Sequence, residues 1–123
     1  PENGYILRSS GPSVYIEPHV EFRRKEFSKE APVDVVITPI VGQSLPAFEL
    51  VHGPQDTIRL IKALRPKFIV PMPNGNLELE GILSKLVTTV GTESEFRKRL
   101  RDLAFANTEI VDLVPGQDQI IKV

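Results

Sequence analysis

The sequence contains no cysteine and no tryptophan, and it has only two histidines among its 123 residues. Without cysteine, the chain forms no disulfide, has no thiolate nucleophile and offers no sulfur ligand to zinc or to an iron–sulfur cluster. Its two imidazoles, those of His19 and His52, are too few for a histidine-rich metal centre built from this chain alone.

An excess of one charge and long apolar runs are also missing. The chain has 15 Lys and Arg and 16 Asp and Glu, which give a net charge of −1, whereas domains that bind nucleic acid are usually basic. No apolar run approaches the roughly 20 residues that span a bilayer. We therefore expect no nucleic-acid partner and no membrane insertion. The lack of disulfides and of a signal peptide favours a reducing compartment.

What the sequence does contain is typical of one globular domain. Its length suits a single hydrophobic core. Apolar residues make up 41% of the chain and charged residues 25%, which is near the globular average. We expect residues 1–123 to form one α/β domain. Because the first residue is Pro1 and not methionine, we expect that this domain was processed or cut from a longer protein.

The first part of the sequence predicts a β-hairpin followed by a βαβ unit. Two short β-prone runs, 5–7 and 14–16, flank a turn-rich connection. Residues 33–37 are apolar at nearly every position, which is typical of a central strand in a parallel sheet. The pattern then predicts a helix over 54–64, with a proline in its first turn, and a strand over 68–70.

The remaining segments predict a long loop, two more helices and a closing strand pair. A loop over 40–53 is long for a connector, and such loops are often functional. Apolar spacing predicts an amphipathic helix over 79–90, and Thr92 with Glu95 forms a capping-box pattern that starts another helix. The other expectations are inward-facing Phe96, Leu100, Leu103 and Ala104, paired strands at 110–114 and 120–123, and a surface loop or short helix over 20–30.

This order of elements resembles the second half of the metallo-β-lactamase fold, which is an αββα sandwich. The most similar branch is the L-ascorbate-6-phosphate-lactonase-like one. The resemblance implies an α/β lobe, with a β-hairpin, a βαβ sheet and helices, from a metal-dependent hydrolase-like protein. The family motif His-x-His-x-Asp-His belongs to the first half and is absent here. The residues that carry the likeness are 4–7, 14–16, Val33 to Ile40, Leu64 to Met72 and Val114-Pro115-Gly116.

The resemblance also implies two metal-ligand positions. In the family, one strand ends near a metal-bridging aspartate and another ends in a metal-binding histidine. Here these positions fall on His19 and Pro73, and proline offers no side-chain ligand. We therefore predict a degenerate metal site with His19 as candidate ligand, assisted by Glu17 or Glu21. Zinc, iron or manganese would be the metals implied. The alternative for His19 is a solvated or hydrogen-bonded loop histidine.

Several polar residues lie where α/β proteins usually bind ligands, just beyond the ends of parallel strands or at the start of a helix. The alternative is a set of turn-rich connectors without a ligand. No catalytic residue is assigned, because a Ser44–His52–Asp56 triad lacks the Gly-x-Ser-x-Gly elbow. The predicted substrate-binding residues are Gly42, Gln43, Ser44, His52 and Asn74.

Three functional classes follow from these patterns. The first is a lobe of a metal-dependent hydrolase-like protein that is inactive alone, because two histidines cannot supply a two-metal centre. Joined to a first-half lobe, it would act on ester, lactone or phosphodiester bonds, by resemblance. The second is an interaction or homodimerisation module, since half a sandwich leaves a sheet face exposed. The third is a metal-free enzyme around Ser44 and His52. The expected location is the cytoplasm or the plastid stroma.

Overall fold

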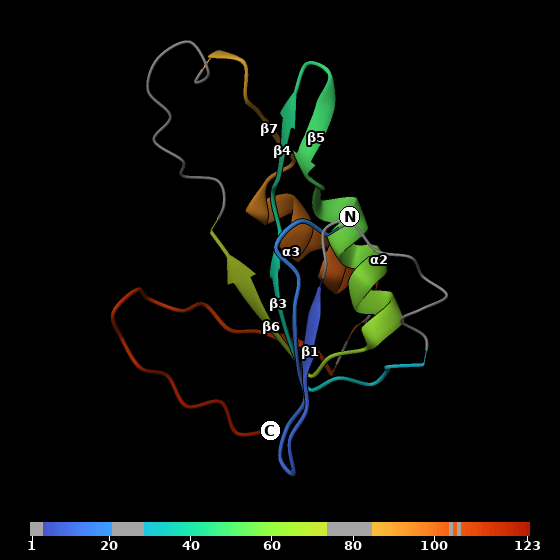
Figure 1. Cartoon of the computed structure of the whole chain (residues 1–123), viewed down its shortest axis with the longest axis vertical. Coiled ribbons are helices and arrows are strands. Elements are labelled where there is room, and N and C mark those ends of the chain that lie inside the picture. The colour runs from blue at the N-terminus through green and yellow to red at the C-terminus, as the bar shows by residue number, and fades with distance from the viewer. Residues whose placement is uncertain (1–3, 21–28, 74–84, 104, 106) are drawn as a thin grey trace.

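A computed structural model describes residues 4–20, 29–73, 85–103, 105 and 107–123 of the chain. Two helices and two sheets account for the regular structure of these residues (Figure 1). In chain order the elements are β1 (Tyr5–Leu7), β2 (Val14–Ile16), β3 (Val35–Pro39), β4 (Gly42–Leu45), β5 (Phe48–Val51), α2 (Pro54–Leu64), β6 (Phe68–Met72), β7 (Thr88–Val90), α3 (Glu93–Asp102) and β8 (Glu109–Ile110).

The larger sheet has the strand order β1-β2-β3-β6-β8, with β3 in the middle. Strand β1 pairs antiparallel with β2, while β2, β3, β6 and β8 run parallel to one another. The predicted hairpin, the predicted central strand and the predicted βαβ unit are therefore confirmed. Strand β6 runs two residues further than predicted, because Pro71 and Met72 still pair with Thr38 and Pro39.

One face of this sheet is covered by the two helices. Tyr15, Val36 and Ile69 are partners in adjacent strands, and each is 0% exposed. Alternate side chains of a strand point to the same face, so these three form one row beneath the helices. They pack in two clusters with the helical residues Leu60, Leu64, Ile61, Phe96 and Leu100.

The opposite face of the sheet carries the intervening side chains. Val35 and Val70 are buried there with Val111 of the C-terminal segment, and Ile121 packs against them. Figure 1 shows this segment looping away from the sheet on the side opposite α2. Towards the β1 edge the cover ends, and Tyr5 and Leu7 are 61% and 57% exposed.

Both helices begin as their local sequence predicts. Helix α2 has Pro54 in its first turn, and Arg65 closes it in a left-handed conformation.

In α3 the Thr92 hydroxyl accepts a hydrogen bond from the Glu95 N–H at 3.1 Å, which confirms half of the capping box. Ion pairs between Glu93 and Arg97 and between Glu95 and Arg99 also join successive turns of α3. None of the described helices is long and apolar enough to span a bilayer.

The predicted loop over 40–53 is wrong. Most of it forms the antiparallel hairpin of β4 and β5, which joins β7 in a separate three-stranded sheet. Figure 1 shows this sheet extending beyond the end of the larger one. The β4–β5 pairing is local, but its strands contain Gly42 and Glu49, residue types that are depleted in strands. The third strand of this sheet, β7, lies more than forty residues further along the sequence than its partner β4.

Three other predictions need correction. Residues 88–90 of the expected helix over 79–90 form β7, since they pair with β4. Residues 79–84 of that expected helix lie outside the described residues. Residues 21–28 of the expected loop or short helix over 20–30 also lie outside them. The expected strand pair at 110–114 and 120–123 is absent, and only Glu109–Ile110 adds to the sheet, in parallel with β6. Leu103 is 42% exposed rather than turned inward, because α3 ends at Asp102.

Candidate functional site

The carboxyl ends of β2, β3 and β6 lie at one edge of the larger sheet, because the three strands are parallel. Helix α2 begins at the same edge, where the Thr57 hydroxyl donates a hydrogen bond to the Pro39 carbonyl at 2.8 Å. Ligands of α/β proteins usually bind at such an edge. The two histidines of the chain both lie there: His19 follows β2 and His52 precedes α2.

The histidines are joined through their backbones. The His52 N–H donates a hydrogen bond to the His19 carbonyl at 3.1 Å. Spacing along the sequence gave no sign of this contact, because it depends on the β4–β5 hairpin returning to the end of β2. The structure thus brings together the predicted metal ligand and one predicted substrate-binding residue.

The His52 imidazole is oriented by two carboxylates. Its Nδ1 lies 3.0 Å from Asp56 Oδ2 and 3.3 Å from Glu49 Oε2. A carboxylate only accepts hydrogen bonds, so the Nδ1 atom of His52 carries a proton in this contact. Asp56 is itself held by Arg59, with 2.8 Å between the two groups. Sequence analysis did not assign Glu49 to the site, although its spacing of three residues from His52 was a usable signal.

A buried carboxylate shapes the turn that carries His19. Glu17 is 1% exposed; its Oε2 accepts a hydrogen bond from the Tyr15 hydroxyl at 2.6 Å, and its Oε1 accepts the N–H groups of His19 and Val20 at 3.2 Å. Burial, and then the adjacent Glu17 carboxylate, raise the pKa of Tyr15 above its usual value. Tyr15 therefore stays protonated and serves Glu17 as a donor.

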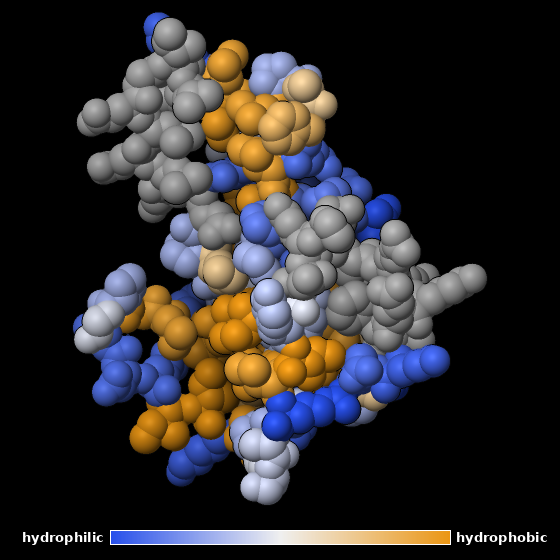
Figure 2. Space-filling model, in the orientation of Figure 1, coloured by the Kyte–Doolittle hydropathy of each residue, from blue (hydrophilic) through white to orange (hydrophobic). Residues whose placement is uncertain are grey.

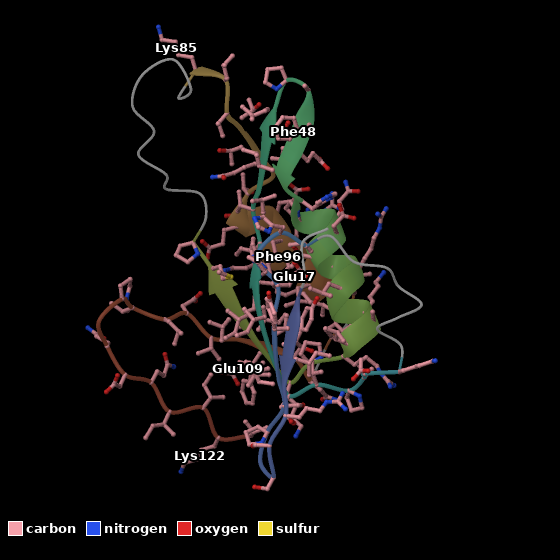
Figure 3. All side chains as sticks on the ribbon, in the orientation of Figure 1. Glu17, Phe48, Lys85, Phe96, Glu109 and Lys122 are labelled. Carbon is pink, nitrogen blue, oxygen red and sulfur yellow. The ribbon has the colours of Figure 1, made fainter. Side chains whose placement is uncertain are left out.

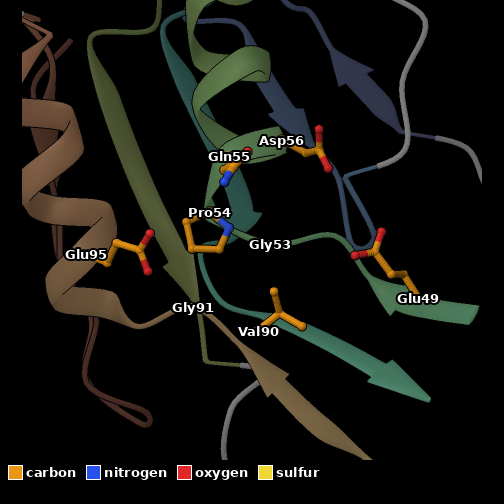
Figure 4. A pocket seen from close by; sticks show the side chains of 8 residues that line it. All are labelled: Glu49, Gly53, Pro54, Gln55, Asp56, Val90, Gly91 and Glu95. Carbon is orange, nitrogen blue, oxygen red and sulfur yellow. The ribbon is translucent and has the colours of Figure 1, made fainter. Parts of the chain in front are cut away.

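A hollow of about 350 Å³ lies beside the start of α2. Figure 4 shows Glu49 and Asp56 on one side of it and Glu95 of α3 on the other, with Pro54 and Val90 between them. Gly91 has a φ of +79°, and a side chain there would collide with the Pro54 ring. This glycine thus lets β7 and α3 approach α2 closely and close one side of the hollow.

The other predicted substrate-binding residues lie mostly apart from this hollow. Gly42 and Gln43 are buried in β4, and a Cβ on Gly42 would lie 2.7 Å from the Cα of Gly53. The Ser44 hydroxyl donates to the neighbouring Leu45 carbonyl at 3.2 Å. Asn74 lies outside the described residues. Gly42, Gln43 and Ser44 do not line the hollow, whose polar lining among the described residues comes from Glu49, Gln55, Asp56 and Glu95.

The described residues do not fit a two-metal centre. Within them, no three His, Asp or Glu side chains gather as a metal-binding group. Both oxygens of Glu17 already accept hydrogen bonds, and the acids near His52 bind the Nδ1 of the same imidazole. At the end of β6, the position of the expected histidine is Pro73. We therefore derive no reaction step through a metal.

A hairpin, a βαβ sheet and a polar carboxyl edge define a mixed α/β lobe of the kind that forms half of a β-lactamase fold. The chain belongs to the β-lactamase superfamily domain family: the sequence model of that family matches residues 1–73. These residues include β1 to β6 and the His19–His52 contact. Among curated proteins, none matches the chain.

Proposed function

We propose that this chain is the C-terminal lobe of a metallo-β-lactamase-type protein of the L-ascorbate-6-phosphate-lactonase-like branch, with a degenerate metal site and no hydrolytic activity of its own. In this proposal its sheet packs against a first-half lobe, which would complete any binding site at the carboxyl edge. The histidines, and Gly42, Gln43, Ser44 and Asn74, would contribute to that shared site. Location in the cytoplasm or the plastid stroma is a prediction from the sequence.

The observation that carries the proposal is the incompletely covered face of the larger sheet. On the helix-covered face, the row of Tyr15, Val36 and Ile69 is fully buried. On the other face, apolar side chains continue to the β1 edge, where Tyr5 and Leu7 stay more than half exposed. Figure 2 shows an apolar area over the lower part of the molecule, around the sheet and the C-terminal segment. Exposed apolar area of this kind is typical of an interface.

The arrangement of His52 supports a binding role for the edge. Metal-ligating histidines usually donate their second ring nitrogen to a carboxylate, which fixes the ring. His52 has this second-nitrogen contact, with Asp56 and Glu49, but it lacks enough companions among the described residues for a complete centre. Such a partial set is consistent with an edge that needs residues from elsewhere.

Metal content per chain tests the degenerate site. Protein purified without chelator should contain zinc, iron and manganese far below one atom per chain when measured by elemental mass spectrometry. His19→Ala and His52→Ala variants should give the same low values. Near-stoichiometric metal that disappears in either variant would contradict the degenerate site and favour a working metal centre.

A hydrolysis screen tests the second part of the proposal. The chain alone, supplied with zinc, iron or manganese, should not hydrolyse ester, lactone or phosphodiester substrates faster than its His52→Ala variant. Turnover that requires metal and is lost in His52→Ala would overturn the inactive-lobe proposal. Turnover without metal that requires both Ser44 and His52 would instead favour the metal-free enzyme.

A homodimer is the alternative partner arrangement. A two-fold symmetric dimer places the same surface patch of both copies face to face. In such a dimer the exposed side chains at the β1 edge of one copy would be covered by those of the other. Light scattering over a range of protein concentrations separates a self-associating chain from one that needs a different lobe.

A further inference from the structure

The turn from Glu17 to Val20 is held by the buried Glu17 carboxylate, which accepts three hydrogen bonds. Two of these donors are the N–H groups of His19 and Val20, and the third is the Tyr15 hydroxyl. We call the Tyr15 and Glu17 side chains, with these two N–H groups, the Glu17 clamp. Figure 3 shows Glu17 in the interior of the domain, close to the helices.

The backbone held by the clamp is unusual. Val20 has a φ of +62°, a left-handed conformation that a β-branched residue rarely adopts without strong support from its surroundings. The clamp provides such support, because Glu17 accepts a hydrogen bond from the N–H of Val20 itself. Without the clamp, the turn would relax towards a commoner backbone conformation.

The backbone of Gly4 packs closely over the clamp. A Cβ added to Gly4 would collide with the Tyr15 hydroxyl oxygen and would lie 2.6 Å from Glu17 Oε2. The backbone at Gly4 therefore runs directly over the Tyr15–Glu17 hydrogen bond and keeps its surroundings dry. Hydrogen bonds in such a low-dielectric place are stronger than in water, and an unpaired group there is costly.

The clamp also reaches the second histidine. The carbonyl of His19, in the middle of the clamped turn, accepts the hydrogen bond from the His52 N–H. The two contacts form a continuous chain from the Tyr15 hydroxyl through Glu17 and the His19 backbone to His52. The side chain of His52 is in turn bound by Asp56 and Glu49.

We propose that Glu17, with Tyr15 as its donor, is a positioning residue that keeps His19 against His52 at the carboxyl edge of the sheet. This inference rests on the proposed function for the role of the two histidines in a shared site. The structural claim is that the His19–His52 contact requires the clamp. This claim involves neither metal binding nor hydrolysis.

Amide hydrogen exchange of the chain, followed residue by residue by NMR, tests the dependence directly. In Glu17→Ala the amides of His19 and Val20 should exchange roughly tenfold faster or more, since their acceptor is gone. The informative amide is that of His52, which does not touch Glu17 and should nevertheless also exchange faster. The central strand amides, such as that of Val36, should keep their protection. A His52 amide that stays protected while the other two lose protection would overturn the proposal.

Conservative variants separate positioning from general destabilisation. Glu17→Gln keeps an oxygen for the two N–H groups and should restore His52 protection almost fully. Tyr15→Phe removes one donor and should give an intermediate effect. Glu109→Ala and Glu109→Gln, at the exposed edge strand β8, make the same chemical changes and should leave His52 unaffected.

If Glu17→Ala does not fold, the Glu17→Gln and Tyr15→Phe pair keeps the test decisive. A Tyr15→Phe variant in which the His52 amide exchanges as in the wild type would then contradict the proposal. Uniformly faster exchange at all amides in Tyr15→Phe, with no excess at His52, would assign the clamp to overall stability and would also overturn the positioning role. None of these outcomes depends on whether the lobe binds metal, so the two proposals fail separately.

Discussion

The two faces of the larger sheet are made from the same strands but differ in what covers them. On one face, Tyr15, Val36 and Ile69 are fully buried under α2 and α3. On the other, Val35 and Val70 are buried beneath the C-terminal segment, while Tyr5 and Leu7 near the edge are exposed. Successive side chains of a strand point to opposite faces, and these strands are apolar at nearly every position. Both faces are therefore apolar, and the sequence pattern alone does not distinguish a covered face from one that needs a partner.

This difference assigns the two faces separate roles. The helix-covered face holds most of the interior of the domain and should carry most of its stability, since stability follows apolar area removed from water. The other face has apolar side chains still in contact with water at the β1 edge, which is the condition for association. The following experiments alter one face and leave the other intact.

The largest effect is expected from removing a side chain of the helix-covered face. Leu60 is 0% exposed and packs against Val36 and Tyr15, so Leu60→Ala should lower the free energy of unfolding by about 2–5 kcal/mol. The same substitution at the exposed Leu7 should change it by no more than about 0.5 kcal/mol. Urea denaturation of both variants provides the comparison. Equal losses would show that the two faces contribute alike.

Association should depend on the other face. If the chain pairs with a second copy through the β1 edge, light scattering should show a mass that rises with protein concentration, and Leu7→Glu should weaken this association at least about tenfold by placing a charge in the interface. Leu103→Glu is a matched control, because Leu103 is also exposed but lies next to α3. A monomer at all concentrations would exclude self-association and leave a different lobe as the expected partner.

A smaller loss is expected when α3 loses its cap. Thr92→Ala removes the hydroxyl that accepts the Glu95 N–H and should cost about 1 kcal/mol of stability. Since α3 places Phe96 on the covered face, hydrogen exchange should increase first in this helix. Thr89→Ala, at an exposed position of β7, is the control. If the two variants lose equal stability, the cap has no specific role.

The smallest effect on stability is expected at the amino ends of the parallel strands, opposite the carboxyl edge. Asp34 accepts hydrogen bonds from the Ser13 N–H and hydroxyl and lies 3.0 Å from the Lys67 ammonium group. The backbone hydrogen bond from Ser13, and then Lys67, hold the pKa of Asp34 below its usual value of 3.8. A carboxyl whose pKa is lower in the folded state stabilises the fold above its unfolded pKa, and this contribution is lost as the pH falls through the folded pKa.

The variant Asp34→Asn isolates this contribution. The wild type should lose more unfolding free energy than Asp34→Asn when the pH falls from about 6 to about 2.5, because only the wild type has this carboxyl to protonate. Urea denaturation at the two pH values measures the difference. Parallel losses in the two proteins would mean that Asp34 is equally easy to protonate in the folded and unfolded states.

Local signals predicted the parts of the fold that depend on neighbouring residues. Pro54 and the apolar stripe of α2 gave the bounds of that helix, and Thr92 gave the start of α3. The continuous apolar run around Val36 indicated a central parallel strand. The helix ends could be predicted because capping depends on residues close in the sequence, and the central strand because a strand covered on both faces is a continuous apolar run. For the site, sequence reasoning placed His19 and His52 near the carboxyl edge, but as separate candidates.

Only the tertiary structure decided which distant segments pair. Residues 88–90 end a stretch, 79–90, whose apolar spacing suits a helix, yet they form β7 because β4 offers them backbone partners. The β4–β5 hairpin brings the His52 N–H to the His19 carbonyl. The fold also buries Glu17 beneath Gly4. The sequence by itself determined the helices and the central strand. The second sheet and the joining of the two histidines were decided by long-range pairing, because a backbone hydrogen bond carries no residue-specific signal.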